Sequence, residues 1–210
     1  MQFVASHAAR AFATGLGLCL AVIAFGADAA PRSSKDKEKD PPPAAKPALV
    51  GSYGDWSVFQ SQSGKNRICY TLAQPKDREP ADLKRDAAYA FISERPAEGV
   101  RNEVSFIMGF DVGAADASEA KGKRKARKGE SDPVAPTAVI GDANFELLPK
   151  GADLWVKNAA KESELIAEMR KGSKLVIKAS SKKGNVTTDT YSLSGFSQAI
   201  DRALKDCPGG

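Results

Sequence analysis

Histidine is almost absent from this sequence of 210 residues. The one histidine, His7, lies in an N-terminal segment that we expect to be removed. A mature chain without histidine has no Ser-His or Cys-His pair for nucleophilic catalysis. It also lacks the histidine ligands of the usual zinc sites. The sequence therefore predicts no catalytic residue, no metal site and no cofactor.

Cysteine is nearly as scarce, with three in the chain, at Cys19, Cys69 and Cys207. Cys19 belongs to the N-terminal segment, and the two that remain are too few for an all-thiolate zinc site. In an exported chain such a pair favours a disulfide. A free, reactive Cys69 is the alternative, although no histidine is present to lower its pKa. We predict a Cys69–Cys207 disulfide that joins an early strand to the last helix.

The first 29 residues have the pattern of a signal peptide. Arg10 is followed by an uncharged, apolar stretch at 11–25, and Ala27-Asp28-Ala29 supplies a small-x-small cleavage motif. The apolar stretch is shorter than the roughly 20 residues that span a bilayer, so a permanent membrane anchor is the less favoured alternative. We therefore predict a signal peptide at 1–29, a periplasmic or secreted mature protein, and no transmembrane segment after cleavage.

The remainder divides into a tether and one domain. Residues 30–48 combine prolines with charges of both signs, which predicts a disordered tether. Residues 49–210 are numerous enough to bury a proper core as a single globular domain.

Apolar residues within this domain alternate with a period of two, which is typical of strands. Short turn signals separate most of these segments, which favours an antiparallel β-sandwich or barrel-like domain of about eight strands. Trp56 and Trp155 lie within strand patterns and are expected in the core. One expected strand contains Trp56 and a second contains Ile68. The other expected strand segments cover residues 87–93, 103–110, 137–148 (a hairpin), 152–158, 174–180 and 185–193.

Two segments have the 3.6-residue period of helices. One is internal, at 161–172, and the other is C-terminal, at 194–207. In the second helix, apolar residues and Cys207 recur on one stripe, which points that cysteine toward the sheet. The members of the stripe are Phe196, Ile200, Ala203 and Cys207.

A basic run interrupts the domain at 113–136. Its richness in Ala, Gly and charge predicts a disordered insertion. Basic side chains of this kind can attract anionic lipid, lipopolysaccharide or sulfated glycans; a solvated loop without a specific partner is the alternative. Nucleic acid is the common partner of such runs, but an exported protein rarely meets it, so we do not expect it here. The candidate anion-binding residues are Lys121, Lys123, Arg124, Lys125, Arg127 and Lys128.

Other motifs with catalytic potential are weak. The Ser-x-x-Lys spacing requires a helix start to place its lysine over the hydroxyl. None of its three occurrences is expected at one: Ser34/Lys37, Ser118/Lys121 and Ser180/Lys183. Carboxylates are plentiful, but nothing in the sequence pairs them as a glycosidase requires. Examples are Asp55, Glu94, Asp111 and Glu146.

The order of several motifs resembles the bacterial invasion-associated locus B family. These are "YGDWSVF", a cysteine on the next strand, "VRNEVSFIMGF", "LIAEMRKGSKLVIKAS" and "YSLSGFSQAID", from about residue 53 to 206. The most specific are Gly-Asp-Trp and Ser-Leu-x-Gly-Phe. The resemblance implies an exported, mainly β protein, associated with host-cell entry in some members and without catalytic residues to carry over. Many members have a further cysteine pair where this chain reads "LWVKNAAKESEL", so their disulfide pattern is not carried over.

These observations predict an exported, non-enzymatic binding or envelope-interaction module whose partner is an unidentified protein or envelope component. Two alternatives remain open at this point. One is a carboxylate-dependent envelope hydrolase, and the other is a purely structural periplasmic protein.

Overall fold

The structure is a computed structural model that describes residues 46–63, 66–113 and 134–208. All of these belong to one compact unit, Pro41–Gly210. The predicted signal peptide and nearly all of the predicted tether lie outside the described residues. No helix in the described ranges is long and apolar enough to cross a membrane.

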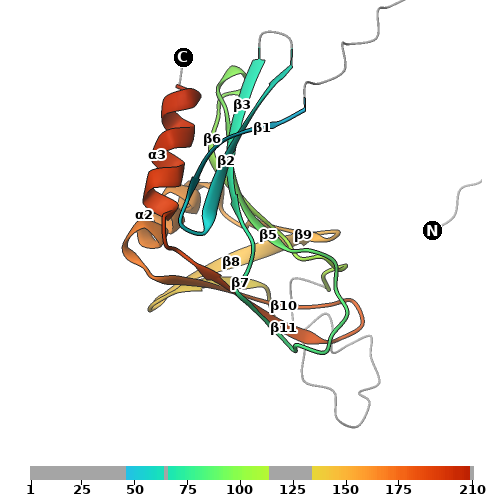
Figure 1. Ribbon diagram of the computed structural model, residues 1–210. Coiled ribbons are helices and arrows are strands. Elements are labelled where there is room, and N and C mark those ends of the chain that lie inside the picture. The colour runs from blue at the N-terminus through green and yellow to red at the C-terminus, as the bar shows by residue number, and fades with distance from the viewer. Residues whose placement is uncertain (1–45, 64–65, 114–133, 209–210) are drawn as a thin grey trace, which may run out of the picture. The chain divides into compact units, whose positions relative to one another are not determined.

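The unit is mainly antiparallel β-structure (Figure 1). Its first strands are β1 (Ala48–Tyr53), β2 (Trp56–Ser63), β3 (Asn66–Ala73), β4 (Asp77–Glu79), β5 (Tyr89–Arg95) and β6 (Val100–Ile107). They are followed by β7 (Thr137–Ile140), β8 (Ala143–Lys150), β9 (Asp153–Val156), β10 (Lys174–Ser180) and β11 (Val186–Ser192). The helices are α2 (Glu162–Lys171) and α3 (Phe196–Asp206), with short 3-10 turns at Pro96–Glu98 and Ala159–Lys161.

The strands form one open sheet in the order β1-β2-β3-β5-β6-β9-β8-β7-β10-β11-β4. The predicted antiparallel fold with an internal and a C-terminal helix is confirmed. The expectation of about eight strands was low, because the described residues contain eleven. With the hairpin counted as two strands, the expected segments account for nine of the eleven, and the two without a counterpart, β1 and β4, are the two edges of the sheet. The sequence Asp-Arg-Glu of β4 has no apolar alternation, and only its backbone pairing with β11 identifies it.

Helix α3 lies against strands β1–β3, and α2 lies against β6 (Figure 1). The side of β3 that faces the core carries the small residues Cys69, Thr71 and Ala73, all buried. Small side chains on a strand let a helix approach closely. Trp56 is fully buried, as expected. Trp155 is only half-buried, because it alternates with buried Leu154 and so faces the other side of the sheet.

Candidate functional site

A disulfide joins Cys69 in β3 to Cys207 at the end of α3, with 5.9 Å between their Cα atoms. This is the pairing that the sequence predicted. Two arginines add to the attachment, since Arg101 Nη1 donates to the Cys207 carbonyl (2.6 Å) and Arg67 Nη1 donates to the Asp206 carbonyl (3.0 Å). The C-terminal end of α3 is therefore attached covalently and by hydrogen bonds. A stable disulfide is typical of proteins in oxidising compartments.

The N-terminal end of α3 is held by the two motifs that were most specific in the sequence. The Asp55 amide donates to the Ser194 carbonyl (3.0 Å), and the Trp56 indole packs edge-on against Phe196 with ring centroids 4.8 Å apart. Gly195 has φ +83°, and a Cβ there would lie 1.9 Å from the Tyr53 carbonyl oxygen. Gly-Asp-Trp and Ser-Leu-x-Gly-Phe thus contact each other, which gives both a structural role.

Glu94 is a fully buried carboxylate on β5, in register with Cys69 of the disulfide. Its Oε1 accepts from the Asn102 amide (3.1 Å), and its Oε2 lies 3.2 Å from Arg101 Nε. Burial raises the pKa of Glu94, although the Asn102 amide and the Arg101 charge act in the opposite direction. This carboxylate is held in place next to the covalent link.

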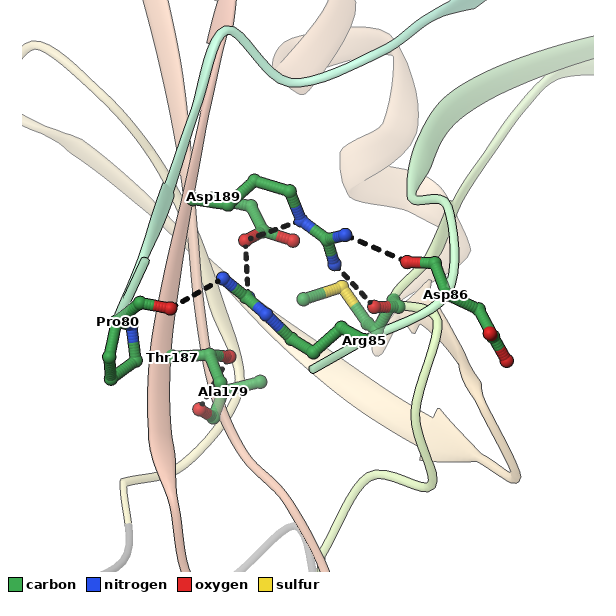
Figure 2. Close-up of polar contacts among 8 residues, drawn as sticks. Pro80, Arg85, Asp86, Ala179, Thr187 and Asp189 are labelled. Carbon is green, nitrogen blue, oxygen red and sulfur yellow. Dashed lines mark hydrogen bonds and ion pairs between the residues drawn. The ribbon is translucent and has the colours of Figure 1, made fainter. Parts of the chain in front are cut away.

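A second buried carboxylate, Asp189 on β11, lies between two arginines (Figure 2). Its Oδ1 accepts from Arg85 Nη1 (2.7 Å) and from Arg78 Nε (3.3 Å). The side chain of Arg85 is only 3% exposed. We call Arg78, Arg85 and Asp189 the arginine–aspartate cluster. With two guanidinium groups and one carboxylate, it has a formal charge of +1.

The same arginines hold the connection between β4 and β5. Arg78 donates to the carbonyls of Asp86 (2.7 Å) and Met108 (2.9 Å), and Arg85 donates to the carbonyl of Pro80 (3.3 Å). Carbonyl oxygens of a loop that would otherwise need water are thereby satisfied. The cluster therefore gives this connection a defined conformation.

The carboxylates considered from the sequence come from different elements and have cationic partners. Asp55 pairs with Lys76, which lowers the pKa of Asp55, and Asp111 lies 3.3 Å from Lys182 Nζ. Glu94 is paired with Arg101, and Glu146 is paired with Lys157.

A cavity of about 470 Å³ beside β8 and β9 is lined by two glutamates, Glu146 and Glu164. Lys157 binds Glu146 (2.8 Å) and lowers its pKa, while Lys161 binds Glu164 (2.5 Å). A general acid in hydrolysis needs a raised pKa, whereas Glu146 is held in its ionised form. Within the described ranges, no group of three metal-ligating side chains is gathered in one place.

The six candidate anion-binding residues, Lys121 to Lys128, lie outside the described residues. The residues that flank this run are described. The Gly113 amide donates to the Ser180 carbonyl (2.7 Å), and the Val134 amide donates to Ser180 Oγ (2.8 Å). Ser180, a member of one Ser-x-x-Lys match, therefore holds both flanks of the insertion at the end of β10, where the expected hairpin turn begins.

No protein-family model and no curated protein matches this chain. A solved structure that is similar is the invasion associated protein b of Bartonella henselae, with a TM-score of 0.47 and 16% identity, over 75% of this chain and 97% of that one.

The arginine–aspartate cluster was missed by sequence reasoning. A usable signal was present in β11, where Asp189 alternates with Thr187 and Tyr191, both buried. A charged residue in the core register of a strand requires a buried partner. The identity of that partner was not evident, because Arg78 and Arg85 precede Asp189 by 111 and 104 residues.

Proposed function

We propose that this chain is an exported, disulfide-linked β domain that acts by binding an anionic component of a cell envelope or a host-cell surface. Its role is contact and not catalysis. The motif resemblance to the invasion-associated locus B family supports a contact role, because some members are associated with host-cell entry. The partner is a protein or an envelope component.

The observation that carries this proposal is the attachment of both flanks of the basic insertion to Ser180. Gly113 and Val134 hydrogen-bond to the same residue, so the chain leaves and re-enters the described domain at one point. Lys182 and Lys183 follow directly in the next turn and are exposed. Lys182 and Lys183 therefore adjoin the point at which the described chain leaves and re-enters, and the sequence of the insertion between Gly113 and Val134 carries six further basic residues.

Electrostatics favour an anionic partner for these basic residues. The chain has a formal net charge of +5. Near an anionic membrane each basic residue contributes about 1 kcal/mol of attraction, and the effect decreases within a Debye length. A group of this size is sufficient for strong, salt-dependent adsorption without a shaped pocket.

The ion pairs of the carboxylates support binding over hydrolysis. In the cavity beside β8 and β9 both glutamates are neutralised by lysine, and Lys157 lowers the pKa of Glu146. The Cys69–Cys207 disulfide supports export, because such bonds persist in oxidising compartments.

Deletion of residues 120–129 tests the proposal. A second variant keeps the length of the chain and replaces the six basic residues of the run by glutamine. Binding to phosphatidylglycerol vesicles and to lipopolysaccharide is measured at low and high salt, with phosphatidylcholine vesicles as the neutral surface. Both variants should bind at least about a hundredfold more weakly than the parent at low salt. Unchanged binding at low salt would contradict the proposal.

A further inference from the structure

A second cavity, of about 330 Å³, lies beside the turn between β10 and β11. Three separate segments line it: the connection before β5, the chain that follows β6, and the turn itself. Residues that matter for its chemistry are Lys84, Phe110, Asp111, Lys182, Lys183 and Asn185. We call it the β10–β11 pocket.

The walls of this pocket are held by backbone hydrogen bonds. In the turn, the Ser181 amide donates to the Asn185 carbonyl (2.9 Å), and the Gly184 amide donates to the Ser181 carbonyl (2.8 Å). The Lys182 amide donates to the Asp111 carbonyl (2.9 Å) and so joins the turn to the chain after β6. Fixed walls reduce the entropy cost of binding a ligand.

The segment before β5, which also lines the pocket, is held by the arginine–aspartate cluster, whose contacts are shown in Figure 2. Arg85 itself lines the pocket, and its guanidinium group is bound to buried Asp189 and to the Pro80 carbonyl. Lys84, its neighbour in the chain, is therefore attached to a backbone with a defined conformation. The formal charge of +1 on the cluster also favours an anion on this side.

The charged side chains of the pocket are four cations and one carboxylate. Two of the cations are already paired, Lys182 with Asp111 (3.3 Å) and Arg85 with Asp189 (2.7 Å). The remaining positive charge belongs to two lysines.

These two lysines, Lys84 and Lys183, are exposed, and their ammonium groups have no ion-pair or hydrogen-bond partner among the residues that the structure describes. The side-chain amide of Asn185 likewise has no partner within those ranges. Leu83 and Phe110 add apolar surface. The pocket thus offers two positive charges, one amide donor and an apolar wall.

We propose that the β10–β11 pocket binds a phosphate monoester, with Lys84 and Lys183 on the phosphate oxygens and Phe110 against the organic group. A phosphate monoester has about 1.5 to 2 negative charges at neutral pH, which matches two unpaired lysines better than a singly charged sulfate or phosphodiester does. A cavity of this volume lies at the lower end of small-molecule sites. The inference rests on the proposed function and deepens it by naming the ligand group.

Two sources of this group are distinguished by two probes. Glycerol 1-phosphate represents a soluble ester, and phosphatidic acid in phosphatidylcholine vesicles represents a lipid headgroup. The double variant Lys84→Gln/Lys183→Gln should bind the effective probe at least about tenfold more weakly, since each lysine contributes a charged contact. The matched control Lys174→Gln/Lys205→Gln removes the same charge from two exposed lysines outside the pocket and should stay within about twofold of the parent.

Amide chemical shifts of Gly184 and Asn185 report directly on the site. Binding of glycerol 1-phosphate with shifts at these amides supports a soluble ester, and binding of phosphatidic acid alone supports a headgroup. Binding of neither probe, or equal losses in the two double variants, would overturn the inference. The chain that lacks residues 120–129 separates the two proposals: it should retain glycerol 1-phosphate binding even where it loses vesicle binding. If glycerol 1-phosphate does not bind and only the deletion weakens vesicle binding, the proposed function remains and the pocket assignment fails.

Discussion

At the β1–β3 end of the sheet, helix α3 is attached by a disulfide and by close backbone packing, whereas at the β4–β11 end the chain is held by a buried ionic cluster. Cys69 and Cys207 form a bond that persists at any protonation state of the domain. Arg78, Arg85 and Asp189 depend on mutual neutralisation, because an uncompensated buried charge is costly. The comparison predicts that the ionic end is the more sensitive to a single side-chain change.

Asp189→Asn should have the largest effect. It leaves Arg85, with a side chain only 3% exposed, without its anionic partner. We expect the free energy of unfolding to fall by about 3–5 kcal/mol, measured by urea denaturation. The control Asp201→Asn removes an ion pair with Arg170 whose aspartate side chain is 64% exposed, and it should cost less than about 1 kcal/mol. Similar losses in the two variants would show that the cluster contributes no more than a surface pair.

Gly195→Ala tests the backbone packing at the other end. The new Cβ would lie 1.9 Å from the Tyr53 carbonyl oxygen, at a φ of +83°. Strain and overpacking together should lower the free energy of unfolding by about 2–4 kcal/mol. Gly141 also has a positive φ (+55°), but a Cβ there would have no atom within 4 Å. Gly141→Ala should therefore lower the free energy of unfolding only through backbone strain, by about 1–2 kcal/mol. Equal unfolding midpoints for the two variants would rule out the close approach.

Cys69→Ala/Cys207→Ala should lower the free energy of unfolding by about 2–4 kcal/mol, because the linked unfolded chain has less conformational freedom to gain. The two cysteines are separated by 138 residues, so the loop closed by the bond is long. Chemical reduction of the parent should shift its thermal midpoint in the same direction. A thermal midpoint that does not change on reduction would contradict a stabilising contribution of the disulfide.

Glu94→Gln should have the smallest effect, seen as a pH dependence. Burial raises the folded-state pKa of Glu94 above its ordinary value of 4.5, so the folded protein binds the proton more tightly than the unfolded chain does. This contribution to stability is fully present below pH 4.5 and is lost as the pH rises through the folded-state pKa. The free energy of unfolding of the variant should therefore decline less steeply than that of the parent as the pH rises over that window. Burial also raises the pKa of Glu162, so Glu162→Gln is the matched variant. A steeper decline of the free energy of unfolding with rising pH in either variant would contradict the predicted sign of the effect.

Much of the fold was predictable because its signals are local. The alternation of Val104, Phe106 and Met108 indicates a strand with one buried face, and the stripe on α3 indicates which side docks. The disulfide was predictable by elimination, since two cysteines remain outside the N-terminal segment. The strand β4 was not, because its three residues are polar and its pairing with β11 spans more than 100 positions.

The candidate site was less predictable for a related reason. Lys84 and Lys183 line the same β10–β11 pocket only because of the fold. The neighbouring contact between Arg85 and Asp189 links residues that are 104 positions apart, and no short sequence motif indicates such a contact. Gly-Asp-Trp and Ser-Leu-x-Gly-Phe were recognisable as motifs, yet their meaning became clear only when Trp56 and Phe196 were seen in contact.

The central claim, an exported domain with an oxidised link between β3 and α3, is tested most directly by peptide mapping under non-reducing conditions. The protein is recovered from outside the inner membrane of the cell that makes it, alkylated without reduction, digested and measured by mass spectrometry. The account predicts a mature N-terminus near residue 30 and a cross-linked peptide that contains Cys69 and Cys207. Two alkylated thiols at these positions, or a chain recovered only from the cytoplasm with its first 29 residues intact, would contradict it.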